Sequence, residues 1–139
     1  MPEHALADDV WRLMASVVIN NHDTWKRAVV ERTGLPFSRV RILTRLARKP
    51  LSVKEIAEAA TIDAPAATVA VNDLTERGLV IRETDPANRR SKTVSLTPAG
   101  RDLLAVIDGV EDPAPESMRA LAETDLLALQ QILHRMRGD

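Results

Sequence analysis

Two short runs with the composition of β-strands stand inside a chain whose other segments have the spacing of helices. The runs are LVIRET, residues 79–84, and KTVSLT, residues 92–97, and the seven residues between them are DPANRRS. Asp-Pro and Asn favour turns, so the two runs are predicted to form a β-hairpin. A single hairpin among helices limits the fold to a mainly α protein with a small β element, in the α+β class.

A long helix is predicted from Ala5 to about Arg32. Its apolar stripe, at spacings of four, three and four, consists of Leu6, Val10, Leu13 and Val17. This spacing places the four side chains on one face of a helix. Gly34 is expected to end the helix, and Pro36 suits the first turn of the next one.

Three shorter helices are predicted between Pro36 and the hairpin. The first is amphipathic, with arginines on its polar face, and Pro50 ends it. The sequence SVKE, residues 52–55, is a capping box that begins the second. Asp63 can cap the third, which extends over residues 64–77 and ends at Gly78. Two short helices with a tight turn between them, followed at once by a hairpin, indicate a winged helix-turn-helix.

The segment after the hairpin is predicted to form two helices separated by a break. Thr97-Pro98 opens the first, and DGVEDPAP, residues 108–115, interrupts it because proline does not suit a helix interior. The second restarts near Thr124 and carries an apolar seam at spacings of three, four and three. The seam consists of Leu126, Leu129, Leu133 and Met136. Such a seam is typical of a helix that packs against another helix, so self-association is expected.

The net charge of −1 conceals a division of charge along the chain. Residues 36–101 contain 12 basic and 7 acidic side chains, whereas residues 102–139 contain 3 basic and 8 acidic ones. A basic middle segment can bind phosphate groups while an acidic end stays away from them. Aromatic residues make up only 2% of the chain, which argues against binding of single strands by base stacking. Duplex nucleic acid is therefore the favoured partner.

Several classes of protein are excluded by what the sequence lacks. It contains no cysteine, and its three histidines have no metal-ligand spacing. No nucleophile–base motif, phosphate-binding loop or paired-carboxylate signature is present, so no enzymatic activity, metal or cofactor is expected. No apolar run approaches the ~18 residues of a membrane span. The acidic start MPEHALADDV is unlike a signal peptide, so a cytoplasmic protein without a membrane partner is predicted.

Residues 51–104 resemble the MarR family of bacterial transcriptional regulators. The segment LTERGLVIR followed by DPANRRSKTVSLTPAG is similar to the end of the family's recognition helix, its wing and its return to helix. The resemblance implies a winged helix-turn-helix at 35–100, flanked by dimerisation helices at 1–34 and 101–139. It also implies a homodimer on a palindromic operator, acting as a repressor that small aromatic or phenolic effectors often release.

The resemblance assigns roles to the hairpin tip. Arg90 takes the position of the family's minor-groove arginine, and Arg89 is its neighbour and a phosphate contact. Many relatives have an aspartate before this pair, which helps to hold the wing arginine, whereas this chain has Asn88. We therefore expect either a looser wing or an arginine held by Asp85. The alternative for both arginines is an ordinary solvated turn.

The predicted recognition helix has few side chains that could recognise bases. Ala66 and Val69 are apolar where relatives often have polar residues. Asn72 could pair with adenine and Thr68 could contact a thymine methyl group, unless both only cap or solvate the helix. The complete set of candidate DNA-binding residues is Ser38, Lys54, Ala64, Pro65, Ala66, Thr68, Val69, Asn72, Asn88, Arg89, Arg90 and Lys92.

Effectors of the family bind between the dimer helices and the winged domain. The residues that could build such a pocket here are Trp11, His22, Trp25, Phe37 and Arg41. Trp and Phe at helical spacing are more often part of a core. Two rival functions remain open. The apolar helix 64–77 favours a protein-interaction module with weak or no specific DNA binding, and the ring-bearing residues favour a small-molecule sensor.

Overall fold

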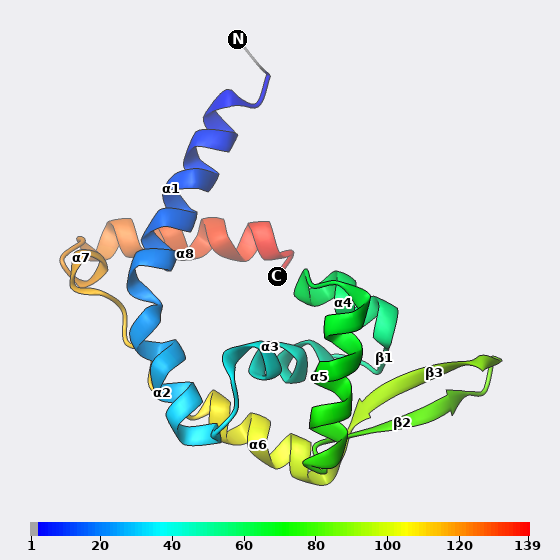
Figure 1. Cartoon of the computed structure of the whole chain (residues 1–139). Helices are drawn as coiled ribbons and strands as arrows, with labels where there is room; N and C mark the ends of the chain where they lie inside the picture. Colours follow the sequence, from blue (N-terminus) through cyan, green and yellow to red (C-terminus); the bar gives the residue numbers. More distant parts are fainter. Residues whose placement is uncertain (1–2) are drawn as a thin grey trace. The chain divides into compact units, whose positions relative to one another are not determined.

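The computed structural model describes residues 3–139, and this range contains eight helices and three short strands (Figure 1). The chain divides into two compact units. One consists of residues 22–110, and the other combines the segment up to Asn21 with residues 111–139. Of the helices in the described range, none is both long and apolar enough to cross a membrane.

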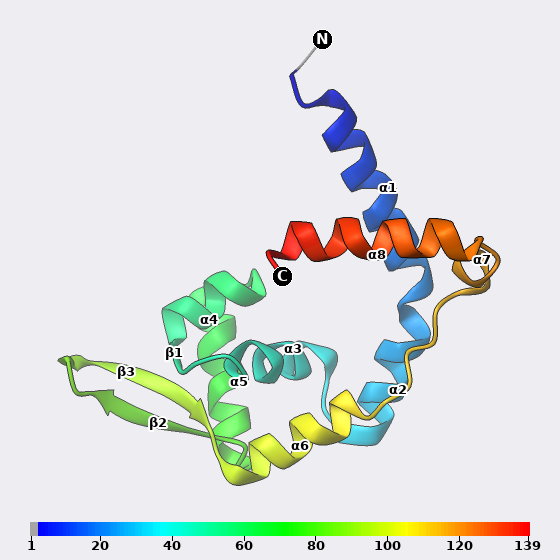
Figure 2. The ribbon, with the colours of Figure 1, turned by 180° about the vertical axis from the view of Figure 1, so that it is seen from behind.

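The unit of residues 22–110 is a winged helix-turn-helix. Its elements are α2 (Asp23–Thr33), α3 (Phe37–Leu46), β1 (Leu51–Ser52), α4 (Val53–Ala60), α5 (Ala64–Glu76), β2 (Val80–Asp85), β3 (Asn88–Leu96) and α6 (Pro98–Asp108). The mainly helical class and the hairpin are thus confirmed. In Figures 1 and 2 the β2–β3 hairpin extends away from the helices of this unit, with its turn at the free end.

The sheet has three antiparallel strands in the order β1-β3-β2. The two-residue strand β1 was not expected from the sequence, and it pairs Leu51 with Val94 of β3. The hairpin register pairs Val80 with Leu96 and shifts at Thr84–Asp85, immediately before the turn. β1 ties the start of α4 to the base of the hairpin, so helix-turn-helix and wing share one framework.

The core of this unit draws on every helix from α2 to α6. Its largest fully buried side chains are Leu35, Ile42, Leu43, Ile56, Leu74, Val29, Val40, Val71, Val80 and Val94. Burial of these apolar side chains away from water supplies the main driving force for folding of the unit.

Local capping sets where the helices begin and end, as predicted. The Ser52 hydroxyl accepts a hydrogen bond from the Glu55 N–H at 3.1 Å, and the Glu55 carboxylate accepts one from the Ser52 N–H at 3.0 Å. The Asp63 carboxylate accepts from the Ala66 N–H at 2.7 Å and begins α5. Thr61 ends α4 with φ 56°, a left-handed conformation that is unusual for a β-branched residue.

The motif TPAG, residues 97–100, lets the first turn of α6 pack closely against the start of the wing. The Thr97 hydroxyl donates to the Gly78 carbonyl at 2.6 Å and accepts from the Gly100 N–H at 3.0 Å. A Cβ atom added at Gly100 would lie 2.2 Å from the Leu79 carbonyl oxygen. Only glycine lets the first turn of α6 approach the start of the wing this closely.

The second unit consists of α1 (Ala5–Asn21), α7 (Glu116–Arg119) and α8 (Glu123–Arg137). These three helices contain no fully buried side chain within the described residues. The large apolar side chains that they leave exposed are Leu6, Val10, Trp11, Leu13, Val17, Val18, Ile19, Leu127, Ile132, Leu133 and Met136. Exposed apolar side chains that form large patches are typical of interaction sites.

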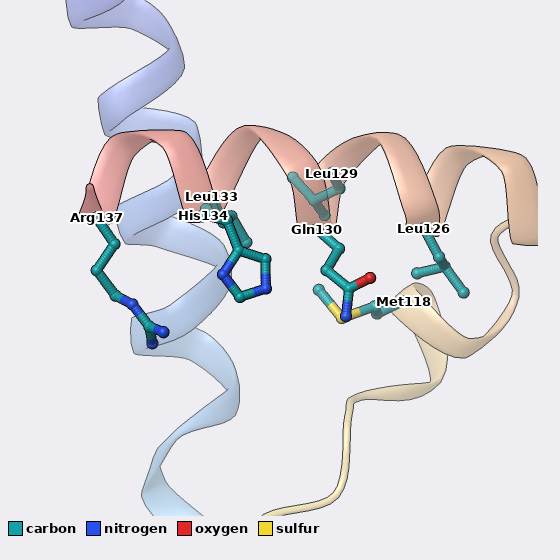
Figure 3. A pocket seen from close by; sticks show the side chains of 7 residues that line it. All are labelled: Met118, Leu126, Leu129, Gln130, Leu133, His134 and Arg137. Carbon is teal, nitrogen blue, oxygen red and sulfur yellow. The ribbon is translucent and has the colours of Figure 1, made fainter. Parts of the chain in front are cut away.

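The apolar seam predicted for α8 is only partly covered by other side chains, so part of it is exposed. Leu126 and Leu129 are half-buried, while Leu133 and Met136 are 40% and 60% exposed. A hollow of about 320 Å³ lies beside α8. Figure 3 shows that Gln130, His134 and Arg137 point to the same side of α8 as Met118 of α7.

The chain divides at other positions than the predicted boundaries at 34/35 and 100/101. The helix expected from Ala5 to about Arg32 is interrupted at His22, where α1 has ended and α2 begins. Val29 of α2 and Ile107 of α6 are buried in the core of the winged unit, so both helices belong to it. Apolar spacing alone could not assign either helix to a unit, because it does not show which partner covers the stripe.

Candidate nucleic-acid interface

Helix α5 has one buried face and one fully exposed face. Ala67, Ala70, Val71 and Leu74 are buried in the core. Because a helix turns by 3.6 residues, the opposite face presents Pro65, Val69, Asn72 and Glu76, all exposed. Val69, near the middle of this outward face, is 61% exposed.

The two polar side chains predicted to recognise bases already have partners within the protein. The Thr68 hydroxyl donates to the Ala64 carbonyl, four residues earlier, at 3.1 Å. The Asn72 side-chain oxygen accepts a hydrogen bond from Nη2 of Arg82, on strand β2. Arg82 was missed from the sequence. Only the hairpin register could have indicated it, by placing it at the base of the wing beside α5.

Asp73 of α5 makes two ion pairs, one to Arg39 of α3 and one to Arg77 at the end of α5 itself. Nε of Arg39 lies 3.1 Å from one Asp73 carboxylate oxygen, and Nε of Arg77 lies 3.0 Å from the other. Hydrogen bonds from Arg77 and then Arg39 hold the pKa of the Asp73 carboxyl below its usual value. The bridge joins two helices that are 34 residues apart in the chain, so it helps to set the angle at which α5 is presented.

The wing tip is organised by its own backbone contacts. The Asp85 carboxylate accepts from the Ala87 N–H at 2.9 Å, and the Asn88 side-chain oxygen accepts from the Arg90 N–H at 3.1 Å. Asn88 therefore closes the turn, and Asp85 does not hold the Arg90 guanidinium as one expectation had it. Across residues 3–139, neither Arg89 nor Arg90 has an intramolecular partner for its guanidinium, and both are exposed.

The remaining candidate contacts lie on the same unit. Ser38 at the start of α3, Lys54 in the first turn of α4 and Lys92 on β3 are all exposed. The Ser38 hydroxyl accepts a long hydrogen bond of 3.4 Å from Arg39. All twelve predicted DNA-binding residues are thus exposed on one compact unit, as a docking surface requires.

Four of the five residues suggested for an effector pocket lie together. The rings of His22 and Trp25 stack at 4.5 Å, and Trp25 meets Phe37 edge to face at 5.8 Å. The Arg41 guanidinium lies 5.7 Å from the centre of the Phe37 ring. Trp25 and Phe37 also pack against the core. Trp11 is in α1, in the other unit, and is 64% exposed.

Among residues 3–139, no three His, Cys, Asp or Glu side chains are grouped so that they could hold a metal ion.

A helix-turn-helix with an exposed second helix, followed by a hairpin whose two tip arginines have no guanidinium partner among residues 3–139, defines this chain as a winged helix-turn-helix protein. Residues 33–91 match the model described as MarR family, so the chain is similar to that family over its helix-turn-helix and most of its wing.

The chain is also similar to individual proteins in sequence or in structure. The chain is 37% identical over 68 residues to a Thauera aromatica protein named as a candidate transcriptional regulatory protein for the hcr operon. That match covers 48% of this chain and 41% of the Thauera protein, so it spans less than half of either. A transcriptional regulator of the MarR family from Silicibacter pomeroyi has a similar structure, with TM-score 0.67 and 25% identity over 98% of this chain and 92% of that one. MarR from E. coli, 17% identical, shares the fold with TM-score 0.71 over 90% of this chain and 94% of its own.

Proposed function

We propose that this protein is a MarR-type transcriptional regulator that binds duplex DNA. The observation that carries the proposal is the pair of free guanidinium groups of Arg89 and Arg90 at the tip of the wing, on the same unit as the exposed face of α5. A recognition helix enters the major groove, and a wing arginine can bind phosphate or the adjoining minor groove. The excess of basic over acidic side chains in residues 36–101, 12 against 7, complements the phosphate backbone.

The protein acts as a homodimer in this proposal. The support comes from α1, α7 and α8, which leave large apolar side chains exposed and contain no fully buried residue in the described range. A second copy would cover this surface, because apolar burial is the main favourable term in stable association. A twofold dimer presents two winged units, and a palindromic operator matches that symmetry.

Repression, and its release by a small aromatic or phenolic acid, complete the proposed function. A regulator that occupies its operator blocks access to the promoter. The aromatic cluster of His22, Trp25 and Phe37 offers stacking partners, and Arg41 beside it can pair with a carboxylate. An acid bound there would contact α2 and α3, and α3 is joined to α5 through Asp73.

A second candidate function rests on a specific observation. The exposed Val69 gives α5 an apolar outward face, which is also a feature of protein-interaction surfaces. In that case the winged unit would bind another protein, and DNA binding would be weak or absent.

A salt titration separates the two functions. The full-length chain would be titrated against a fluorescently labelled pool of random-sequence 30-bp duplexes between 50 and 200 mM KCl. DNA binding through phosphate contacts predicts that log K falls linearly with log salt concentration. Absence of binding at 50 mM, or binding without a salt slope, would refute the regulator function. Sedimentation equilibrium tests the dimer, because a stable species of 15.3 kDa at micromolar concentration would contradict it.

A further inference from the structure

The outward face of α5 has an unusual composition for a helix that enters the major groove. From Ala64 to Val69 its exposed residues are small or apolar, with Thr68 as the one exception. Direct recognition of bases in this groove normally uses arginine, lysine, asparagine or glutamine. The early turns of α5 supply none of these, so their contribution to specificity has to come from another kind of contact.

The polar groups nearest to this face are engaged. The Thr68 hydroxyl donates its proton to the Ala64 carbonyl at 3.1 Å, which leaves it only as an acceptor toward a ligand. The Asn72 side-chain oxygen accepts from Arg82, which fixes the amide with its NH₂ group turned away from that bond. Asn72 thereby loses the freedom to turn its amide and adapt to different base edges. The apolar residues remain as the part of the face without a partner.

Val69 is the side chain that protrudes from this face. It is 61% exposed near the middle of α5. The two exposed side chains that precede it there, those of Ala66 and Thr68, do not extend farther from the backbone than the Val69 side chain. Ala67 and Ala70 point into the core, so the backbone around Val69 is held rigidly. A rigid isopropyl group in the major groove finds one apolar feature there, the C5 methyl group of thymine.

We infer that α5 recognises thymine by its methyl group, with Val69 as the specificity-determining side chain. The inference rests on the proposed DNA binding and deepens it. Duplex DNA is the favoured occupant of this apolar face because Arg82 contacts Asn72 of α5 and the same unit also carries the exposed cations Lys54, Arg89 and Arg90. Exposed acidic groups oppose phosphate only at the two ends of α5, where Asp63 is the N-cap and Glu76 lies in the last turn.

If Val69 contacts a thymine methyl group, removal of that methyl group should lower the affinity for DNA by a defined factor. Deoxyuridine has the hydrogen-bonding groups of thymidine and lacks only the methyl group, so it isolates the contact. Removal of one contacted methyl group is expected to lower the affinity about fourfold, from the transfer free energy of one buried methylene-sized group. Two twofold-related contacts would lower it about 16-fold.

The test begins with duplexes that the full-length wild-type protein selects from a randomised pool. One selected duplex is then remade with deoxyuridine in place of thymidine, at one position at a time. We expect the wild type to lose about fourfold in affinity at one or two positions in each half-site and nothing elsewhere. Val69→Ala should bind the thymidine and deoxyuridine duplexes equally, whereas Val69→Ile should keep the difference. Val106→Ala, which truncates another exposed valine in α6 of the same unit, is the matched control and should behave as the wild type.

The possible failures are distinguishable. If no duplex is selected even at low salt, the proposed DNA-binding function fails, and a protein partner becomes the occupant of the α5 face. If duplexes are selected but deoxyuridine has no effect at any position, DNA binding stands and methyl recognition is refuted. A small loss spread evenly over all positions also refutes it, because that pattern reflects altered DNA shape. Retention of the fourfold difference by Val69→Ala would assign methyl recognition to another residue and overturn the role of Val69.

Discussion

Neutralising the two wing arginines should weaken DNA binding without weakening the fold. In the part of the chain that the structure describes, neither Arg89 nor Arg90 has a guanidinium partner, and both are exposed. The double variant Arg89→Gln/Arg90→Gln therefore removes no intramolecular interaction of these groups. Its free energy of unfolding should stay within about 0.5 kcal/mol of the wild type, as for ordinary surface substitutions. Thermal unfolding followed by circular dichroism checks this first condition.

The magnitude of the binding effect follows from counterion release. Each neutralised phosphate contributes about −0.9 to the slope of log K against log salt concentration. Loss of both arginines should reduce the slope by up to about 1.8 for each winged unit that is bound. Between 50 and 200 mM salt the wild type should then lose about tenfold more affinity per unit than the variant does. Fluorescence anisotropy on one labelled duplex at four salt concentrations measures both slopes.

A control variant separates the wing from charge in general. Arg27→Gln/Arg32→Gln removes the same two charges from exposed positions of α2, outside the wing. Its salt slope should equal that of the wild type. An unchanged slope in the wing variant would refute the assignment of Arg89 and Arg90 to phosphate or groove. An equal reduction in both variants would show that only the total charge matters.

Three further predictions concern stability. Gly100→Ala should lower the free energy of unfolding in urea by about 2 kcal/mol, because the new Cβ would lie 2.2 Å from the Leu79 carbonyl oxygen. Gly109→Ala is the control and should change it little, because its new Cβ would be no closer than 3.4 Å to any neighbouring atom. Thr61→Gly should raise the midpoint of thermal unfolding by a few degrees, since it relieves a left-handed conformation that costs a non-glycine residue about 1 kcal/mol. Asp73→Asn should be less stable than the wild type at neutral pH. That difference should shrink as the pH falls below about 4, because the depressed pKa of Asp73 stabilises the fold only while the carboxylate is ionised. A difference that does not shrink at all on acidification would contradict this.

The parts of the fold that sequence predicted well are those set by short-range chemistry. The capping box at Ser52, the cap at Asp63 and the left-handed glycine at Gly34 each involve atoms within a few residues, so their signatures are local. The hairpin was also predictable, since its turn residues and strands are contiguous. By contrast, β1 has two residues and exists only because Leu51 meets Val94, 43 positions later, which no local pattern indicates.

The candidate site divides in the same way. Exposure of the polar members of the twelve proposed contact residues agrees with the polarity of their side chains, whereas exposure of the apolar members on α5, such as Val69, does not follow from it. The orientation of Asn72 does not follow from that pattern, because it depends on Arg82 from another element. From the sequence, asparagine instead of aspartate at position 88 predicted either a looser wing or an arginine held by Asp85. In the structure Asn88 closes the turn through the Arg90 N–H and leaves that guanidinium free.

By itself, the sequence determined the position of the wing, the concentration of basic charge in residues 36–101 and most of the order of helices and strands, although not the break at His22 or strand β1, because propensity, capping and composition act over short distances. Only the tertiary structure decided that α2 and α6 belong to the winged unit and that α1, α7 and α8 have no buried core of their own. It also decided that Val69 is left as the protruding group of α5. The physical reason is that burial and hydrogen-bond partners are properties of residues brought together from distant positions, and an amphipathic pattern does not specify which surface covers it.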